Sequence, residues 1–195
     1  MYTFDHNLFL WLNFDGGVVM DKLMLLASTP VAWSWFYLLI FYLVWRRGGW
    51  KGLALFAVTV VAGIVLADMV AGIFKHTGLL KNLLPNFPVR LRPMHTPELA
   101  GMIHKIKEGG LYGTVSAHAA TNVVLVIIAS VFIKRRWMTL TMVAVALIIC
   151  YSRIYLAYHF PMDLLLGAAA GALCALVALA VCRPFMKRVF TDKTE

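Results

Sequence analysis

The sequence predicts an all-α membrane protein, a polytopic bundle of transmembrane helices built from one chain of 195 residues. Hydrophobic residues make up 62% of the chain, whereas soluble domains contain roughly 45–50% apolar residues. Charged residues are scarce, at 14%. So small a chain could not hide this much apolar surface in its own core. The composition therefore excludes a soluble monomer, a disordered chain and a disulfide scaffold, and it leaves lipid as the solvent.

Long uncharged runs, separated by short charged segments, identify the individual helices. A membrane-spanning helix needs roughly 17–25 mostly apolar residues. Five runs of about this length lie at residues 29–45, 52–74, 114–133, 137–152 and 164–182. The first begins with Thr29 and Pro30, a pair typical of a helix N-cap followed by proline in the first turn. The runs are too continuous for barrel strands, so we expect five transmembrane helices.

The first 28 residues follow a different pattern. An apolar run rich in aromatic residues lies between Asp5 and Asp15, and it is too short to cross a membrane. An interfacial helix is the prediction for residues 1–28, and a sixth span is the alternative. The segment lacks the basic start and small-residue cleavage site of a signal peptide. Residues 1–195 are expected to form a single domain.

The basic residues predict the orientation of the chain. Eighteen Lys and Arg residues against nine Asp and Glu residues give a net charge of +9. If five helices alternate, two connectors and the C-terminal tail share one side, which should be cytoplasmic by the positive-inside rule. Ten basic residues gather on that side: Arg46, Arg47, Lys51, Lys134, Arg135, Arg136, Arg183, Lys187, Arg188 and Lys193.

The segment 75–113 is the exception, because it is long and basic on the opposite side. Its cations are Lys75, Lys81, Arg90, Arg92, Lys105 and Lys107. A connection of this length is usually functional or disordered. Positive charge on this side indicates a role other than topology. His95 and His104, in the same segment, fit no metal-ligand spacing and are expected to be solvated or to contact a substrate head group.

Further reactive side chains lie at helix ends on the same side as this segment. They are Lys75, Ser116, His118, Arg153, His159 and Asp163. Ionisable residues at membrane depth are costly and are usually functional. Two helix N-termini beside Lys and Arg would form an anion pocket without a metal ion. Asp68 lies seven residues before Lys75 on the same helix face, and we expect it to be a structural partner of Lys75 or of another helix.

Three short motifs follow one another along this region. They are Arg92-Pro93, then Val115-Ser116-Ala117-His118, then Ser152-Arg153-x5-His159-x3-Asp163. Together they resemble the signature of the type 2 phosphatidic acid phosphatase family, whose superfamily includes the vanadium haloperoxidases. That signature reads Lys-x6-Arg-Pro, Pro-Ser-Gly-His and Ser-Arg-x5-His-x3-Asp. The third motif matches at every defined position, and the resemblance covers about residues 68–166.

Two departures from the family pattern affect the first and second motifs. The second motif lacks its Pro and Gly, but Ala117 still offers a backbone N–H and suits the first turn of a helix. In the first motif, Pro85 stands where the family has lysine, seven residues before Arg92. Lys75, which ends the second predicted helix, is the best candidate for this lysine, and Lys81 is the alternative.

The resemblance implies a mechanism. His159 would attack the phosphorus and form a phosphohistidine intermediate, while Asp163, one turn later, would bind the other ring nitrogen. His118 would protonate the leaving group and then activate water. The phosphoryl oxygens would be bound by Lys75, Arg92, Ser116, Ala117 and Arg153. No cofactor or metal is expected, because cations already surround the anion and the carboxylate clusters of a magnesium site are absent from the sequence.

The predicted function is therefore that of an integral lipid phosphatase of the bacterial inner (plasma) membrane, acting on its periplasmic or outer face. The expected partners are the bilayer and a lipid phosphate, without nucleic acid. Undecaprenyl diphosphate, lipid A phosphate and phosphatidic acid are the candidate substrates, and residues 94–113 are expected to choose among them. The alternatives are a protein that binds or transports lipid phosphates and, against the composition, a vanadate-dependent haloperoxidase. Binding alone would need cations but not the pair His159 and Asp163.

Overall fold

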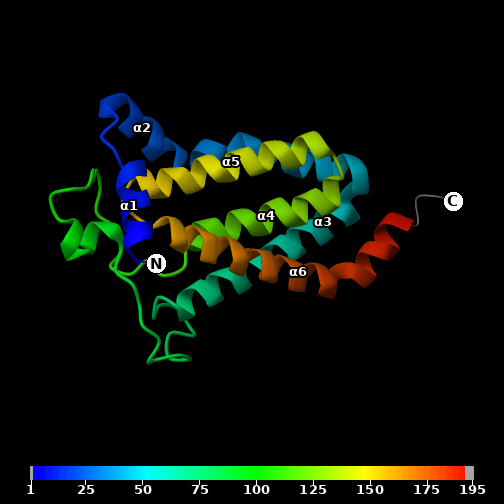
Figure 1. Cartoon of the computed structure of the whole chain (residues 1–195). Coiled ribbons are helices and arrows are strands. Elements are labelled where there is room, and N and C mark those ends of the chain that lie inside the picture. Colours follow the sequence, from blue (N-terminus) through cyan, green and yellow to red (C-terminus); the bar gives the residue numbers. More distant parts are fainter. Residues whose placement is uncertain (1, 192–195) are drawn as a thin grey trace.

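The computed structural model describes residues 2–191, which fold as a helical bundle (Figure 1). Within these residues there is no β-strand, and one isolated bridge joins Leu91 and Tyr112. The all-helical fold class is thus confirmed. In chain order the helices are α1 (Tyr2–Leu12), α2 (Gly17–Ala27), the 3₁₀ turn η1 (Pro30–Trp33), α3 (Ser34–Ile73), the 3₁₀ turns η2 (Pro93–His95) and η3 (Pro97–Leu99), α4 (Ala117–Ile133), α5 (Arg136–Tyr155) and α6 (Pro161–Thr191).

Helix α3 contains two of the predicted spans. They are two helical halves joined at Gly49, where the chain turns sharply. This glycine has φ 62° and ψ −162°, a conformation that side chains disfavour. The two halves of α3 run in opposite directions and, with α4, α5 and α6, correspond to the five predicted runs (Figure 1). Three stretches, Pro30–Ile73, Arg136–Tyr155 and Pro161–Phe190, are long and apolar enough to cross a membrane, and α4 is a shorter apolar helix. The number of crossings stays a prediction.

The N-terminal segment forms two short helices instead of one. Helices α1 and α2 have 11 residues each, which corresponds to about 16 Å and is too short to span a bilayer. Both lie at the end of the bundle that carries the long loop (Figure 1). Helix α1 packs against α5 and α6, with Phe9 fully buried and Asp5 only 4% exposed. It therefore closes this end of the bundle as part of the core.

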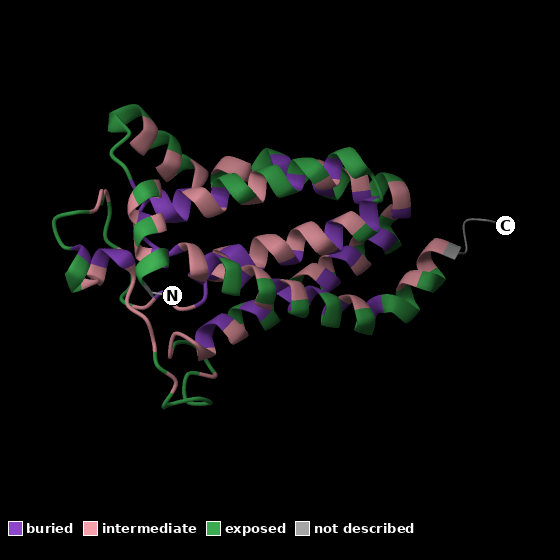
Figure 2. Cartoon of the chain, viewed as in Figure 1, coloured by how far each residue is buried: buried purple, intermediate pink, exposed green. Residues whose placement is uncertain are grey.

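The hydrophobic core follows one stripe along α4. Ala120, Val124, Ile128 and Phe132, spaced four residues apart, are fully buried against α3 and α6. On the outside of the bundle, Leu147, Leu165 and Leu173 are exposed. Figure 2 shows exposed residues along the outer sides of α5 and α6. A bundle that is apolar outside as well as inside is typical of a protein surrounded by lipid.

A pair of glycines brings the N-terminal ends of α4 and α6 together. Gly167 and Gly171 are four residues apart on α6, and a Cβ atom at either position would clash with a carbonyl oxygen of α4, that of Ser116 or of Ala120. Small residues at this spacing let membrane helices approach closely. The contact places the second sequence motif beside the third.

Thr29 and Pro30 take the predicted N-cap and first-turn positions, at the 3₁₀ turn η1 that leads into α3. Thr29 does not cap this turn with its side chain. Its hydroxyl donates instead to the carbonyl oxygen of Leu26, at 2.7 Å, and Pro30 begins the 3₁₀ turn that precedes α3. The threonine therefore ties the corner to α2, which places the neighbouring Ser28 at the loop end of the bundle.

The two ends of the bundle divide the chain as the alternation of helices predicts. The turn at Gly49, the connection between α4 and α5 and the end of α6 lie together at one end (Figure 1). The long loop, α1, α2 and the turn after α5 lie at the other. Of the ten basic residues assigned to the first end, Lys193 lies outside the described residues.

Candidate active site

His159 lies in a tight turn that reverses the chain between α5 and α6. The backbone N–H groups of Tyr158 and His159 donate to the carbonyl oxygen of Arg153, at 2.9 and 3.3 Å, and Ala157 adopts a positive φ of 55°. The turn thus holds the histidine backbone directly against the last turn of α5. The His159 side chain is 1% exposed, so its environment is set by the protein.

Asp163 lies one helical turn after His159 and is directed at it. The Nδ1 atom of His159 is 3.4 Å from Oδ2 of Asp163, and the same oxygen accepts a hydrogen bond from the N–H of Phe160 at 3.0 Å. Gly113 covers this pair, because a Cβ atom there would lie 3.0 Å from Oδ2 of Asp163. The carboxylate is therefore positioned to orient the imidazole, as the sequence predicts from the spacing.

The surroundings of His159 keep its ring neutral. Burial lowers the pKa of His159 well below its ordinary value, and the positive charges of Lys75, Arg92 and Arg153 lower it further. A neutral imidazole that donates from Nδ1 to Asp163 has its lone pair on Nε2. The geometry and the charge state together give His159 the properties of a nucleophile.

Lys75 directly follows α3 and is half-buried. Burial lowers its pKa to about 8, neighbouring Arg92 and Arg153 lower it as well, and the carboxylates of Asp163 and Asp68 oppose the shift. Lys81, the alternative for the first-motif lysine, is exposed in the loop. Of the two candidates, Lys75 is the lysine whose charge acts on His159.

Arg92 is fixed by the backbone of the loop. Its Nε donates to the carbonyl oxygen of Tyr112 at 3.1 Å, its backbone N–H donates to Leu111, and its guanidinium lies 5.6 Å from the ring centre of Tyr158. Burial lowers the pKa of Arg92. The guanidinium is thereby held at the site with most of its N–H groups free of these bonds.

Arg153, in the last turn of α5, is buried and incompletely satisfied. One Nη atom donates to the Ser28 hydroxyl, and the guanidinium lies 4.3 Å from the ring centre of Tyr158. Its Nε is a buried donor with no acceptor among the described residues. An unsatisfied buried donor costs about 1–3 kcal/mol. A bound anion would relieve this cost.

The N-terminus of α4 carries the second motif. Ser116 is fully buried and caps the helix, since its Oγ accepts from the N–H of Ala119 at 3.4 Å, and its own N–H donates to the carbonyl oxygen of Asp163. Ala117 and His118 follow in the first helical turn, where N–H groups have no partner within the helix. This end of α4 therefore offers N–H donors, a positive helix dipole and an imidazole.

The N-terminus of α6 differs from the prediction of a second free helix end. Its donors are already used, because the N–H of Phe160 binds Asp163 and the N–H of Met162 binds Oδ1 of Asp5 at 3.0 Å. Two carboxylates of the protein thus occupy the place predicted for the substrate anion. One helix N-terminus, that of α4, is directed at the site with free N–H groups.

The sequence reasoning missed two residues that support Asp163. Arg90 Nη1 lies 2.5 Å from Oδ2 of Asp5 and 3.5 Å from Oδ1 of Asp163, and its guanidinium stacks 3.6 Å from the ring centre of Phe160. A continuous chain of contacts therefore runs from His159 through Asp163 and Arg90 to Asp5. The available signal was a carboxylate inside an aromatic-rich apolar segment, which is costly without a partner.

The loop histidines are only partly exposed and contact the protein, where the prediction was solvent or a substrate head group. Nε2 of His104 lies 2.8 Å from Oδ1 of Asp21, and the backbone N–H of His104 donates to Oδ1 of Asn13. Nε2 of His95 lies 3.1 Å from the carbonyl oxygen of Gly109. The two side chains hold the loop to the N-terminal helices and to itself.

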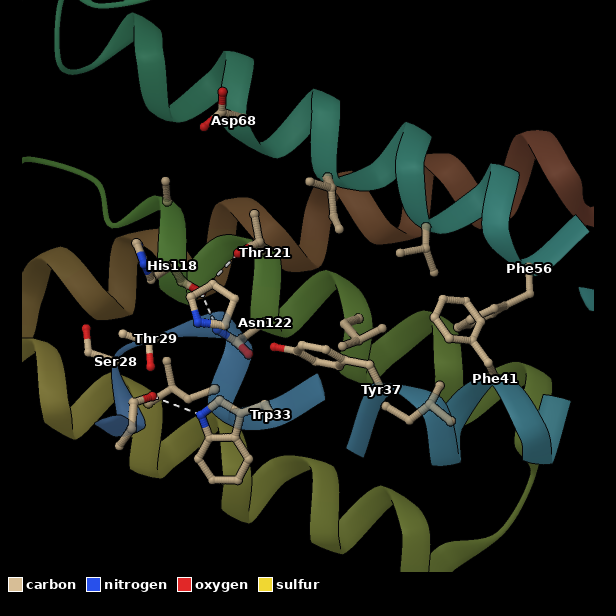
Figure 3. A pocket seen from close by; sticks show the side chains of 18 residues that line it. Ser28, Thr29, Trp33, Tyr37, Phe41, Phe56, Asp68, His118, Thr121 and Asn122 are labelled. Carbon is tan, nitrogen blue, oxygen red and sulfur yellow. Dashed lines mark hydrogen bonds between the residues drawn. The ribbon is translucent and has the colours of Figure 1, made fainter. Parts of the chain in front are cut away.

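Two cavities of different character border the candidate site. One, of about 460 Å³, is lined mainly by apolar side chains of α3 and α4 and reaches Ala117 and His118 (Figure 3). The other, of about 340 Å³, has a mixed lining that includes Arg92, Arg153, Lys107 and Glu108 beside Leu25 and Leu156. Ser28 and Thr29, at the corner between α2 and η1, line both. The candidate site thus adjoins the apolar pocket through His118 and the mixed cavity through Arg92 and Arg153.

Comparison with known proteins identifies the family. The model of the PAP2 superfamily matches residues 57–187, which is 131 of the 195 residues. The chain belongs to the PAP2 superfamily. This PAP2 protein is 30% identical over 171 residues to a lipid A 4'-phosphatase of Bacteroides thetaiotaomicron, a match that covers 86% of this chain and 72% of that relative. It is 26% identical over 172 residues to a lipid A 4'-phosphatase of Porphyromonas gingivalis, covering 86% and 68%.

A solved structure agrees with the fold. The crystal structure of Aquifex aeolicus LpxE superposes on this PAP2 protein with a TM-score of 0.63, at 21% sequence identity, covering 89% of this chain and 93% of that one. At this identity the likeness shows the fold. The predicted family and the predicted enzyme class, a phosphatase, are confirmed by the family match and the two relatives.

Proposed function

We propose that this PAP2 protein is a metal-independent membrane lipid phosphatase that acts through a phosphohistidine, with lipid A-type phosphates as its first candidate substrates. One observation carries the proposal. The pair His159 and Asp163 is buried, the charges of Lys75, Arg92 and Arg153 act on His159, and His118, which also acts on it, lines an apolar pocket. A binding protein would need the cations but not a neutral, oriented imidazole. The active site is proposed to face the periplasm or exterior of a bacterial inner membrane, as the positive-inside rule predicts.

In the first step, Nε2 of His159 attacks the phosphorus. The bond from phosphorus to the lipid oxygen breaks, and His118 gives its proton to that oxygen. The imidazolium that forms is stabilised by Asp163. Lys75, Arg92 and Arg153 bind the phosphoryl oxygens as negative charge shifts to the leaving group.

In the second step, water releases the phosphate. His118, now without its proton, takes a proton from a water molecule, whose oxygen attacks the phosphorus of the phosphohistidine. The bond from phosphorus to Nε2 breaks, inorganic phosphate leaves, and His159 returns to its neutral form. The proton on His118 is then in place for the next cycle. No metal ion is needed at any point, because the three cations already neutralise the phosphoryl group.

The two cavities support a substrate with a tail and a polar head. Ligand pockets have volumes of about 300–1,000 Å³, and the apolar pocket, at about 460 Å³, lies in this range. We assign the tail to it and the head group to the mixed cavity, beside Lys107 and Glu108. The names of the two relatives favour lipid A-type phosphates. Undecaprenyl diphosphate and phosphatidic acid are the alternatives, and residues 94–113 are proposed to contribute to the choice.

The test is phosphate release by the purified protein from a panel of these lipids in the presence of EDTA. We expect release from at least one lipid, unchanged by EDTA, and a loss of at least about a thousandfold in His159→Ala. Equal activity in the variant, or no release from any lipid, contradicts the enzyme function. Loss of activity in EDTA contradicts the metal-independent mechanism. Lipid binding without release in both proteins would instead support the binding or transport alternative.

A further inference from the structure

A carboxylate lies inside the apolar pocket and takes no part in the mechanism above. Asp68, on the second half of α3, lines this pocket, and Figure 3 shows it across the cavity from His118. It is exposed to the cavity. Among residues 2–191 it forms no hydrogen bond and no ion pair, although its charge acts on Lys75. The expected partnership with Lys75 is therefore electrostatic and not a direct ion pair, and the carboxylate oxygens are left facing the cavity.

Other polar side chains line the same pocket as Asp68. Asp68 lies five residues before the end of α3, which is about 7.5 Å along that helix. Thr121 and Asn122 follow His118 by three and four residues on α4, which is about 4.5–6 Å along that helix. Both line the same pocket. Figure 3 shows the hydroxyl of Tyr37 directed toward Asn122. These pocket-lining residues, Asp68 on α3 and Thr121 and Asn122 one helical turn after His118 on α4, are called the polar layer here.

The polar layer presents acceptors to a ligand. The side-chain N–H of Asn122 donates to the carbonyl oxygen of His118 at 2.8 Å, and the Thr121 hydroxyl donates to the same oxygen at 3.3 Å. Their oxygens Oδ1 and Oγ1 remain available, and Asp68 adds a carboxylate, which accepts hydrogen bonds only. A ligand in this pocket therefore meets acceptors on both walls, close to where its phosphate would bind.

We propose that the polar layer selects lipid phosphates that carry N–H or O–H donors near the phosphate, as acylated amino-sugar phosphates do. Prenyl chains have no donors, and diacylglycerol phosphates bring ester oxygens, which are acceptors. Each would leave Asp68 buried under the ligand without a partner, and sites built to hydrogen-bond a substrate group reject analogues that lack it. The inference rests on the proposed function, since it names the substrate class of the same site.

The experiment compares three substrates in mixed micelles with the purified full-length protein. They are an N-acylated glucosamine phosphate lipid, a prenyl diphosphate and dioleoyl phosphatidic acid. In Asp68→Leu we expect kcat/KM for the amino-sugar lipid to fall roughly 10- to 100-fold, the effect of losing hydrogen bonds to a charged group, with a change below about twofold for the others. Asp68→Asn keeps an acceptor oxygen without the charge and should lose less. Val65→Ala, exposed on the same helix and outside the pocket lining, is the matched control.

Each outcome decides between roles for Asp68. Equal losses on all three substrates in a variant that retains its thermal transition would overturn the inference and assign Asp68 to the support of Lys75. No loss on any substrate, or a wild-type protein without preference for the amino-sugar lipid, overturns it as well. If Asp68→Leu does not fold, the test uses Asp68→Asn. The loss of kcat/KM on the amino-sugar lipid is then compared with the losses on the other two substrates. A wild-type protein that releases phosphate from no lipid contradicts the proposed function itself, which separates the two failures.

Discussion

The two ends of the helical bundle both carry basic side chains but hold them in opposite ways. At the loop end, Arg90, Arg92 and Arg153 are at least partly buried, and each guanidinium lies against an aromatic ring. At the opposite end, Arg135 and Arg136 are exposed. The difference lies in solvation, because a charge removed from water must recover its hydration energy from partners.

At the loop end, the described residues offer too few carboxylates and hydrogen-bond acceptors for the buried cations. Arg90 is matched by Asp5 and Asp163, whereas Arg153 keeps a buried N–H without an acceptor among the described residues. At the opposite end, Arg47 donates to the carbonyl oxygen of Phe132 near the end of α4, at 2.5 Å, and so contributes to structure. In the proposed function the uncompensated buried cations bind an anion, while the solvated cations predict the orientation through the positive-inside rule.

The strongest test of this difference replaces one arginine at each end. In Arg153→Met we expect kcat/KM to fall about 100- to 1,000-fold, as when a preorganised donor to a developing negative charge is removed. In Arg136→Met, the matched change at the exposed end of the same helix, we expect a change below about twofold. Phosphate release from the best lipid of the panel measures both. Similar losses in the two variants would remove the functional distinction between the ends.

A second test concerns the support of the site by α1. Asp5→Asn keeps the size of the side chain but removes the charge that neutralises Arg90, so Arg90 should draw Asp163 away from His159. We expect kcat to fall about tenfold, equivalent to about 1.4 kcal/mol, with little change in KM because no substrate contact is lost. The control is Asp15→Asn, an exposed carboxylate in the same N-terminal region. A rise in KM at constant kcat would show that Asp5 acts on binding instead.

The fold was largely predictable because its main determinant is local. Five apolar runs predicted five helical segments, and each is found, with the first two joined through Gly49 in α3. The burial of α1 was not predictable from its composition. An aromatic segment packs equally well on a membrane surface or on a protein, and only the tertiary contact between Asp5 and Arg90 decides between them.

The residues of the candidate site could be predicted where one helical turn fixes the spacing between them. They could not be predicted where their positions depend on the folding of a loop. The pairing of His159 with Asp163 follows from their separation by four residues. Arg90 could not be singled out from the other loop cations, because its position depends on how the loop folds back over Phe160. The use of the α6 donors by Asp5 and Asp163 likewise arises between distant segments.

The smallest expected effect concerns Lys75, a cation of the site whose pKa lies close to neutral pH. With a pKa of about 8 in the free protein, its ammonium loses its proton as the pH rises through 8, and with it the attraction for phosphate. The pH profile of kcat/KM, which reports groups of the free enzyme, should therefore fall above about pH 8. Lys75→Arg keeps its charge at every accessible pH, so this fall should move upward while activity at pH 7 changes less than about tenfold. Lys81→Arg should leave the profile unchanged, whereas a shift in Lys81→Arg alone would assign the first-motif lysine to position 81.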